Sequence, residues 1–548
     1  MNTSKRPFFA VLGFFSLSLA AAAAATACSN EDFTPDASGA QPDGDGGTTN
    51  PDAAGSPDGG SPDAAAQPDA APCIPTGGED RPDDDFADTN CDGIDGDVTH
   101  GVFVSPAGSD GAEGSMAAPV ASIGKAVALA QAAQKDVYVC NGTYAENVVI
   151  ETTGVALFGG YDCTKGWTRS SERARIAPGS GIPLRIKSAN DTAIDRLELS
   201  APAGVDPGES SIAATVETST GVVLNRAELI AADAAPGKPG TPATANTTPA
   251  ISGAAGANVA VSQCLTANPP AGACKQAAAG GVQSALVQCD SPLKHRGGDG
   301  GKGGNVYLKA ATQKGANGLT FGAKGGQPGF AGSPGQPGQA GTAGEPGGKF
   351  GSVVDGVYVP SNAGTDATAG KMGEAAGGGS GGETWWVPDV GAWYVVGAGG
   401  GQGGYPGCGG DGGKAGGGGG ASIALIATGS DITIRWSKLK TGAGGDGGAP
   451  SDGAAGQPGG KGGAGGSCST GSGCEGKPGG DGGSGGKGGP GGPGGGGPSI
   501  GILTTGATPT TDAVTFDLGA PGNGASGFDG KSAASGEAGD IVTVPSTP

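Results

Sequence analysis

Side-chain oxygens alternate along one short acidic stretch of this chain. The candidate metal ligands in it are Asp88, Asn90, Asp92, Asp95 and Asp97. The first three, followed by Gly93, have the order of the first half of a calcium-binding loop, in which alternate side chains point inward and glycine allows a tight turn. Thr99 stands where an EF-hand carries its bidentate glutamate. Calcium is the one cofactor that the sequence indicates, and an acidic turn in solvent is the alternative.

A second group of residues is aromatic and flanks the turn Pro388-Asp389-Val390-Gly391. Its members are Trp385, Trp386, Trp393 and Tyr394. Aromatic residues on both sides of a short turn predict a β-hairpin. Aromatic faces on a surface hairpin can stack on sugar rings, so the sequence indicates a polysaccharide, or another component of an envelope or matrix, as partner. The alternative is that these rings pack over neighbouring glycines.

One cysteine follows a leader of the kind that directs export. Lys5 and Arg6 precede an apolar run, and small residues then lead to Ala27-Cys28. This arrangement resembles the bacterial lipobox, in which the cysteine thiol is acylated and becomes the new amino terminus. The resemblance implies an outer-membrane or cell-surface lipoprotein that meets the membrane through lipid on Cys28. Ala25 stands where lipoboxes more often carry leucine, so cleavage of an ordinary secretory signal is the alternative.

The other cysteines form an even set, as expected for disulfides in an oxidising compartment, because removing Cys28 from eleven leaves ten. Short separations predict three pairs, which are Cys73–Cys91, Cys140–Cys163 and Cys468–Cys474. Four cysteines remain for two bridges of open connectivity: Cys264, Cys274, Cys289 and Cys408. A cysteine metal site is the weaker interpretation, because the chain has no Cys-x-x-Cys pair and only two histidines.

Catalytic patterns are sparse in this sequence. Arg185-Ile186-Lys187 matches one short motif of polygalacturonase-like enzymes, but no Gly-His-Gly accompanies it, so we interpret the match as coincidence. Asp191, Asp195 and Arg196 are the nearest group to a lyase site, and a solvated turn explains them better. The sequence therefore favours a non-catalytic surface protein with a structural, adhesive or matrix-binding role. A divergent polysaccharide lyase or glycosidase is the alternative.

Three stretches of the chain repeat one pattern of short β-type runs, over residues 211–229, 422–439 and 499–518. A unit with two or three short strands is stable only when neighbours cover it, so the repeat predicts a solenoid. The expected fold is all-β, a right-handed single-stranded parallel β-helix with an amphipathic N-terminal capping helix. Glycine-rich tracts follow each repeat at the same position, so they should leave the β-helix along one edge.

Several tracts keep glycine at every third residue, as in residues 326–347 and 479–494. Three residues per turn is the period of the polyproline II helix, and glycine is needed where such helices meet backbone to backbone. These insertions resemble the glycine-rich PGRS segments of mycobacterial surface proteins, for which packed polyglycine II-like bundles are plausible. Disorder of the tracts is the alternative.

The opening of the repeat region also resembles a known family. The matching residues are Phe103-Val104-Ser105-Pro106, Ser122-Ile123, Asp136-Val137-Tyr138-Val139 and Gly142-Thr143-Tyr144. They are similar to the domain of unknown function that begins many bacterial pectin-lyase-like, right-handed β-helix surface proteins. The helix expected after Ser122 carries Ile123, Ala126, Val127 and Ala130 on one face. This resemblance implies a fold and not a reaction.

Composition limits the partners and divides the chain. The net charge of −21 excludes nucleic acid as a partner on electrostatic grounds, and 120 glycines limit the part that can form a side-chain core. We expect the following parts: a signal peptide over 1–27, a disordered Pro/Asp/Ala/Gly stalk over 28–72, an acidic loop stapled by cysteine over 73–100, cap and first rungs over 101–230, a glycine-rich insertion over 231–420, a rung over 421–440, a second insertion over 441–497, and the last rung with a glycine-rich tail over 498–548.

Overall fold

The structure is a computed structural model, and the chain divides into two units, residues 1–71 and 72–548. The structure describes residues 73–259, 278–285, 289, 296–303, 314–317, 323–383, 385–387, 393–395, 397–468 and 473–545. The expected leader, Cys28 and the stalk lie outside the described residues.

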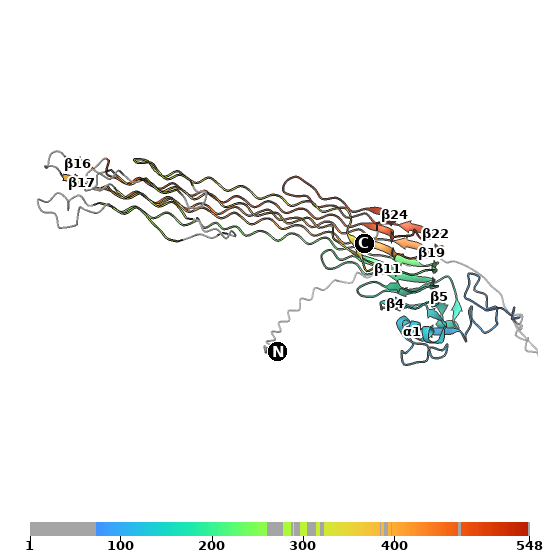
Figure 1. The fold of residues 1–548 in the computed structure, drawn as a ribbon. Coiled ribbons are helices and arrows are strands. Elements are labelled where there is room, and N and C mark those ends of the chain that lie inside the picture. The colour runs from blue at the N-terminus through green and yellow to red at the C-terminus, as the bar shows by residue number, and fades with distance from the viewer. Residues whose placement is uncertain are drawn as a thin grey trace, which may run out of the picture. The chain divides into compact units, whose positions relative to one another are not determined.

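Three parallel sheets form the folded core of the second unit (Figure 1). Sheet 1 contains β1 (Gly101–Val104), β2 (Asp136–Cys140), β5 (Ala156–Asp162), β9 (Ala193–Asp195), β12 (Val222–Asn225), β19 (Ile432–Arg435) and β22 (Thr510–Asp512), with β6 (Thr168–Arg169) antiparallel to β5. Sheet 2 contains β3 (Thr143–Tyr144), β7 (Ala174–Ile176), β10 (Leu197–Ser200), β13 (Glu228–Ile230), β20 (Lys438–Lys440) and β23 (Thr515–Asp517). Sheet 3 contains β4 (Val148–Ile150), β8 (Leu184–Lys187), β11 (Ser211–Glu217), β18 (Ser422–Thr428), β21 (Ser499–Thr505) and β24 (Ala538–Thr543).

The chain passes through the sheets in a fixed order, sheet 3 then sheet 1 then sheet 2. We call each set of three strands, one from each sheet, a coil. The expected repeats are coils in register, because Ser211 pairs with Ser422 and Ser422 pairs with Ser499. Apolar side chains such as Leu224 and Ile434 are buried between the sheets. The chain is thus nearly all β and parallel, as the sequence predicts.

A single residue in the left-handed region turns the chain from sheet 1 to sheet 2. Equivalent positions in successive coils form a column at this corner, here called the corner column: Arg196 (φ 49°), Arg226 (φ 49°), Trp436 (φ 44°) and Ala513 (φ 49°). Such a φ is strained for a residue with a Cβ and persists where the surrounding hydrogen bonds impose it. The backbone N–H groups of Arg196 and Arg226 donate to Asn225 (3.1 Å) and Arg435 (3.0 Å) in the next coil, which holds the column in register.

Helix α1 (Ile123–Ala133) covers the first coil, and it is the helix that the sequence predicts. Its buried face is Ile123, Ala126, Val127 and Ala130, and the Ser122 hydroxyl caps it by accepting from the N–H of Lys125 (3.3 Å). The helix packs against β1, β2 and β4, which include the first strands of sheets 1 and 3. Apolar burial by this helix protects the strand edges at that end from solvent and from other chains.

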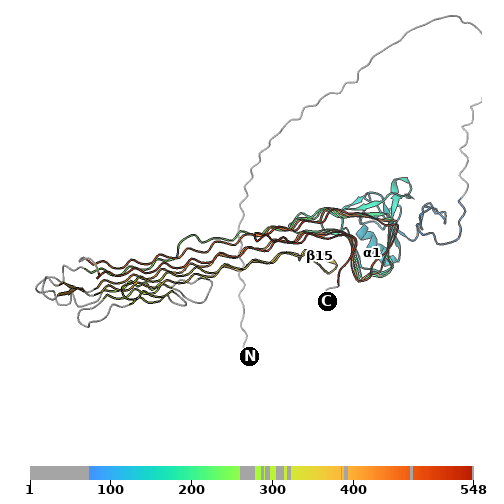
Figure 2. The ribbon, with the colours of Figure 1, turned by 90° about the horizontal axis from the view of Figure 1, so that it is seen from above.

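The glycine-rich tracts leave the coils after strands of sheet 2 and return before strands of sheet 3, as expected (Figures 1 and 2). The hydrogen-bond register of sheet 2 continues into them at every third residue. Ala231 donates to Lys440 (2.9 Å), Ala234 to Ala443 (2.9 Å), and Gly237 to Asp446 (2.7 Å). The backbone hydrogen bonding of sheet 2 therefore continues into the tracts, but only one residue in three donates to the neighbouring segment.

The segment 478–497 lies in the middle of these tracts. It exchanges backbone hydrogen bonds with residues 332–347, 362–377, 404–419 and 445–463. Its amide donors are the two glycines of each triplet, so proline is tolerated at the third position, as in Pro490 and Pro493. This regular bonding orders the segments against one another, with the three-residue period of the polyproline II helix. We call residues 332–347, 362–383, 397–421, 441–467 and 474–498 the glycine bundle.

Two strand-forming segments differ from the division of the chain that the sequence predicts. The 231–420 insertion contains a hairpin, β14 (Ser352–Val354) and β15 (Val357–Val359), which covers the outer face of sheet 3. The expected glycine-rich tail ends in strand β24, which pairs in parallel with β21. Neither short segment has a repeat or turn signal strong enough to predict it, because long-range pairing fixes both.

Candidate functional site

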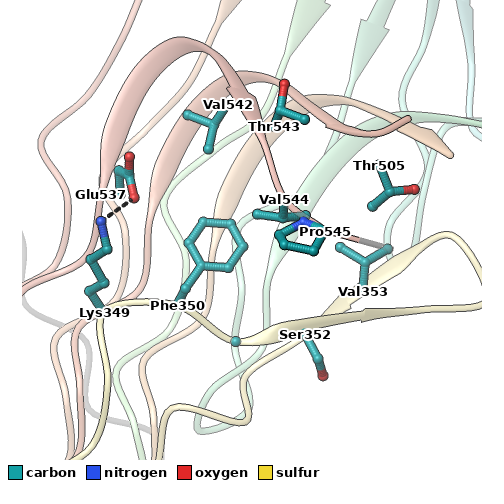
Figure 3. Close-up of a pocket in the computed structure, with 11 residues that line it drawn as sticks. Lys349, Phe350, Ser352, Val353, Thr505, Glu537, Val542, Thr543, Val544 and Pro545 are labelled. Carbon is teal, nitrogen blue, oxygen red and sulfur yellow. Dashed lines mark ion pairs between the residues drawn. The ribbon is translucent and has the colours of Figure 1, made fainter. Parts of the chain in front are cut away.

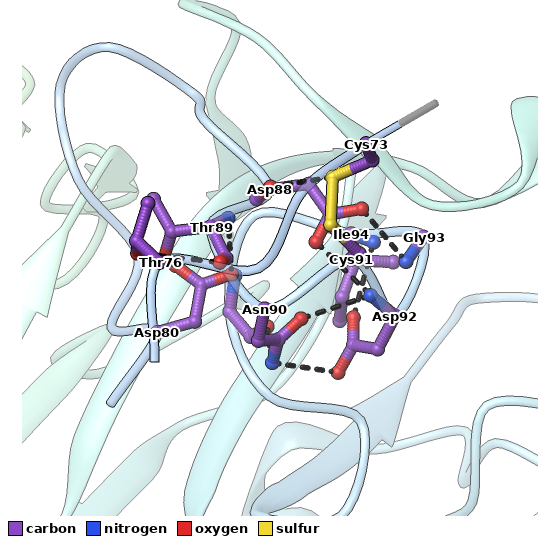
Figure 4. Close-up of a disulfide and its surroundings, with 11 residues drawn as sticks. Cys73, Thr76, Asp80, Asp88, Thr89, Asn90, Cys91, Asp92, Gly93 and Ile94 are labelled. Carbon is purple, nitrogen blue, oxygen red and sulfur yellow. Dashed lines mark hydrogen bonds between the residues drawn. A yellow bond between two sulfur atoms is a disulfide. The ribbon is translucent and has the colours of Figure 1, made fainter. Parts of the chain in front are cut away.

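The acidic segment that follows the stalk is stapled by the disulfide Cys73–Cys91, as predicted (Figure 4). Asp88 accepts from the backbone N–H groups of Asp92 (3.1 Å) and Gly93 (2.9 Å). Asn90 donates to the Asp92 carboxylate (3.0 Å). The first half of the expected calcium loop is thus turned inward, and its oxygens satisfy the segment's own donors.

The two remaining candidate ligands lie elsewhere. Asp95 is buried and pairs with Arg169 (3.0 Å), and Asp97 accepts from the Thr99 hydroxyl (2.6 Å) and contacts His100 (3.0 Å). The Thr99 hydrogen bond lowers the pKa of Asp97 to about 2. Within the described ranges, no three His, Cys, Asp or Glu side chains are grouped to hold a metal. Asp95 therefore does not fit as a calcium ligand, and calcium binding by Asp88, Asn90 and Asp92 stays a prediction.

Asp95 is held away from the other candidate ligands by its ion pair with Arg169. The guanidinium of Arg169 is fully buried, donates to the carbonyls of Gly159 (3.1 Å) and Asp83 (2.8 Å), and pairs with the carboxylates of Asp95 and Asp195. A buried charge is stable only when it is paired and hydrogen-bonded, which holds here. The network fastens the acidic segment to sheet 1.

The interpretation of Asp195 and Arg196 as a solvated turn is wrong. Both are buried, and Arg196 donates to Asp195 (2.8 Å) and to Asp84 (2.7 Å). Asp84 also receives two hydrogen bonds from Arg226, at 2.6 and 3.0 Å. A sequence search for like spacing could have found this cluster, because Arg196 and Arg226 occupy the same position of two repeats.

The aromatic hairpin is formed as predicted. Strand β16 (Trp385–Val387) pairs antiparallel with β17 (Trp393–Val395), and Trp386 stands directly opposite Tyr394. The turn residues 388–392 lie outside the described residues.

This hairpin joins two segments of the glycine bundle at the end away from the sheets (Figure 1). Next to it, Glu383 donates to Gly473 (3.0 Å) and Ala398 donates to Cys474 (2.8 Å). The disulfide Cys468–Cys474 links the neighbouring turn. The end of the bundle is thus a crosslinked platform from which β16 and β17 extend.

Two further disulfides are present in the described residues. Cys140–Cys163 is present as predicted, and Cys289–Cys408 is one of the two bridges whose connectivity the sequence leaves open. Cys264 and Cys274 lie outside the described residues.

A groove of about 520 Å³ lies between the β14–β15 hairpin and β24 (Figure 3). Phe350, Val353 and Val542 line it, and Lys349 pairs with Glu537 (3.0 Å) at its rim. A second groove over sheet 3 is bordered by Glu209, which accepts from the N–H groups of Val205 (2.7 Å) and Asp206 (2.9 Å). These carboxylates are already engaged, so neither groove offers the pair of free carboxyl groups that glycoside hydrolysis needs.

Arg185 and Lys187, the outward residues of the motif that matches polygalacturonases, both lie near one carboxylate. Arg185 is 3.2 Å and Lys187 is 3.8 Å from Glu217, while Ile186 is buried in the core. The motif therefore has a structural explanation on β8.

In the described part of the chain, no helix is long and apolar enough to span a membrane. Comparison with protein-family models, with curated proteins and with solved structures gave no match.

Proposed function

We propose that this protein is a non-catalytic, exported surface lipoprotein in which the glycine bundle is a stiff spacer. The spacer presents the β16–β17 hairpin to a polysaccharide or another envelope or matrix component. The single observation that carries the proposal is the continuous period-three hydrogen bonding that runs from the sheets to the hairpin end.

The three sheets are proposed to be the faces of a right-handed parallel β-helix. Each coil contributes one strand to each sheet in the order 3, 1, 2, and successive coils pair in parallel. Connections between parallel strands of one sheet are right-handed in nearly all proteins, which supports this hand.

A spacer needs length and stiffness. Residues 397–421 would span roughly 75 Å at about 3.1 Å per residue of polyproline II helix. Each bundle segment in the middle is bonded on several sides, and the disulfide Cys289–Cys408 ties a further part of the chain to the bundle. An isolated polyproline II helix has no internal hydrogen bonds, so these lateral bonds supply the stiffness.

The hairpin is suited to adhesion because its two strands carry four aromatic residues, Trp385, Trp386, Trp393 and Tyr394. Stacking of Trp and Tyr on pyranose rings uses large apolar area with little loss of side-chain entropy. The proposed attachment to a membrane is lipid on Cys28, supported by the lipobox-like residues that precede it.

The test uses the full chain and the double variant Trp386→Ala/Tyr394→Ala, with co-sedimentation on a panel of insoluble polysaccharides. We expect at least tenfold weaker binding of the variant to whichever polysaccharide the parent binds. Phe330→Ala is the matched control, because Phe330 is an exposed aromatic residue outside the hairpin. Equal binding by parent and double variant, or no binding to any surface polymer, would refute the adhesive role. Release of new reducing ends or unsaturated sugars from the polysaccharide would instead support the alternative, a divergent glycosidase or polysaccharide lyase.

Mass spectrometry of the mature protein tests the anchor. A diacyl or triacyl mass on an amino-terminal Cys28 is expected. An unmodified Cys28, or a different amino terminus, would leave a protein that is secreted without an anchor.

A further inference from the structure

A cleft of about 440 Å³ lies between the acidic segment and the outer face of sheet 1. The residues that line it include Ala193, Val223, Asp84 and Trp436. The volume is in the range of sites for small ligands. No part of the proposed adhesive function uses this cleft.

Trp436 is the one aromatic member of the corner column. The Arg226 guanidinium lies over its ring, 5.1 Å from the centroid, and so covers one face. The next coil places Ala513 at the same position, about 4.8 Å further along the stack, and alanine is too small to cover the indole. Trp436 is accordingly 45% exposed, which is unusual for a large ring beside a formed cleft.

Two of the three carboxylates that line the cleft are paired with arginines, and the third, Asp83, is exposed and accepts from the N–H of Asp85 (2.8 Å). Asp84 is held by Arg196 and Arg226, and the hydrogen bond from Arg226 lowers its pKa. Asp195 is held by Arg169 and Arg196. These groups therefore keep their negative charge but have few lone pairs to offer.

Two guanidinium groups of the cleft are not neutralised. Arg81 and Arg435 line it, and the structure gives neither of them an ion-pair partner among the residues that it describes. Arg435 is the last residue of β19 and directly precedes Trp436. Guanidinium binds carboxylate and sulfate groups through two parallel hydrogen bonds, and among the described residues the two unpaired guanidinium groups of the cleft outnumber its one unpaired carboxylate, Asp83.

We propose that this cleft binds a sugar unit that carries an anionic group. The pyranose ring lies against the indole of Trp436, and the anionic group lies between Arg435 and Arg81. The −21 charge of the whole chain opposes this only weakly at physiological salt, where charges more than about 8 Å apart are largely screened. The shared ligand chemistry is the anionic sugar, and the anion is either a carboxylate or a sulfate.

Calorimetric titration of the full chain with glucuronic acid, glucose 6-sulfate and glucose tests the proposal. We expect at least one of the acids to bind with at least tenfold higher affinity than glucose. Binding of glucuronic acid alone assigns the carboxylate, and binding of glucose 6-sulfate alone assigns the sulfate. If neither acid binds at millimolar concentration, or glucose binds equally well, the proposal is wrong.

Variants locate the site. Arg435→Gln removes charge from an exposed side chain and is expected to weaken binding of the acid at least tenfold without a change in melting temperature. Trp436→Ala should weaken binding of the acid to a similar degree. Lys440→Gln is the matched control, because Lys440 is an exposed cation on sheet 2. Unchanged affinity in Arg435→Gln would overturn the assignment of the site. The hairpin variant Trp386→Ala/Tyr394→Ala should leave the affinity for the acid unchanged.

Discussion

Gly485 packs so closely on the backbone carbonyl group of Cys408 that a methyl group at Gly485 would overlap it. The same holds for Gly488 and the carbonyl of Asp411. Glycine is therefore required at these positions by contact between backbones and not by an unusual φ. This contact decides the first prediction.

Gly485→Ala should destabilise the bundle by about 1–3 kcal/mol, the cost of overpacking a close-packed interior. Ser484→Ala is the control, because Ser484 already carries a Cβ that points out of the contact, and its effect should stay within about 0.5 kcal/mol. Hydrogen exchange of the amides of residues 479–494 measures both. Protection in Gly485→Ala equal to that of Ser484→Ala would contradict the packing.

Removal of the buried Arg169 should have a larger effect. Arg169→Ala leaves Asp95 and Asp195 without their shared cation, and breaking a buried pair costs about 3–5 kcal/mol. The control is Arg175→Ala, which breaks a half-exposed pair with Glu198 (2.9 Å) worth about 1 kcal/mol or less. Chemical unfolding followed by fluorescence compares them, and equal midpoints would show that Arg169 does not fasten the acidic segment.

Acid should loosen the acidic segment. The pKa of Asp97 is lowered from its ordinary 3.8 to about 2, so its contribution to stability is present above pH 3.8 and is lost as the pH falls toward about 2. Asp84 acts in the same direction, since Arg226 lowers its pKa. Asp95 acts in the opposite direction, because burial raises its pKa. Limited proteolysis by pepsin between pH 4 and 2 measures the net effect, and Asp97→Asn should reduce the change.

Micromolar calcium should leave the melting temperature unchanged. Asp95 is committed to Arg169 and Asp97 to Thr99 and His100, so only three of the five candidate ligands remain together. A thermal shift in micromolar calcium that is lost in Asp88→Asn/Asp92→Asn would contradict this expectation. The variant Asp97→Asn is its matched control.

The sequence predicts those elements whose cause is local or repeated. The face of α1 follows from the spacing of Ile123, Ala126 and Ala130, and the coils follow from the recurring Ser-Ile starts. The hairpin of Trp386 and Tyr394 follows from a turn between aromatic runs. Each of these signals lies within a few residues of chain.

What could not be predicted depends on residues far apart in the chain. Arg169 meets Asp95 and Asp195 only because two successive coils and the acidic segment come together. Cys408 pairs with Cys289 across 119 residues, and no spacing rule selects that partner from the three possible ones. The exposure of the Trp436 ring likewise depends on the small Ala513 at the same position of the next coil, and that relation can be seen only once the register is known.

The continuation of the sheet register into the glycine bundle has a mechanical consequence. A pull on the hairpin, directed along the bundle, would load the bonds between neighbouring segments in shear. Many bonds, such as those from Gly482 to Gly460 and from Gly488 to Ala454, would then share the force at once. Segments joined in this way resist slipping far better than strands that are peeled apart one bond at a time. The glycine bundle can therefore carry tension from the hairpin although it has few side chains to pack.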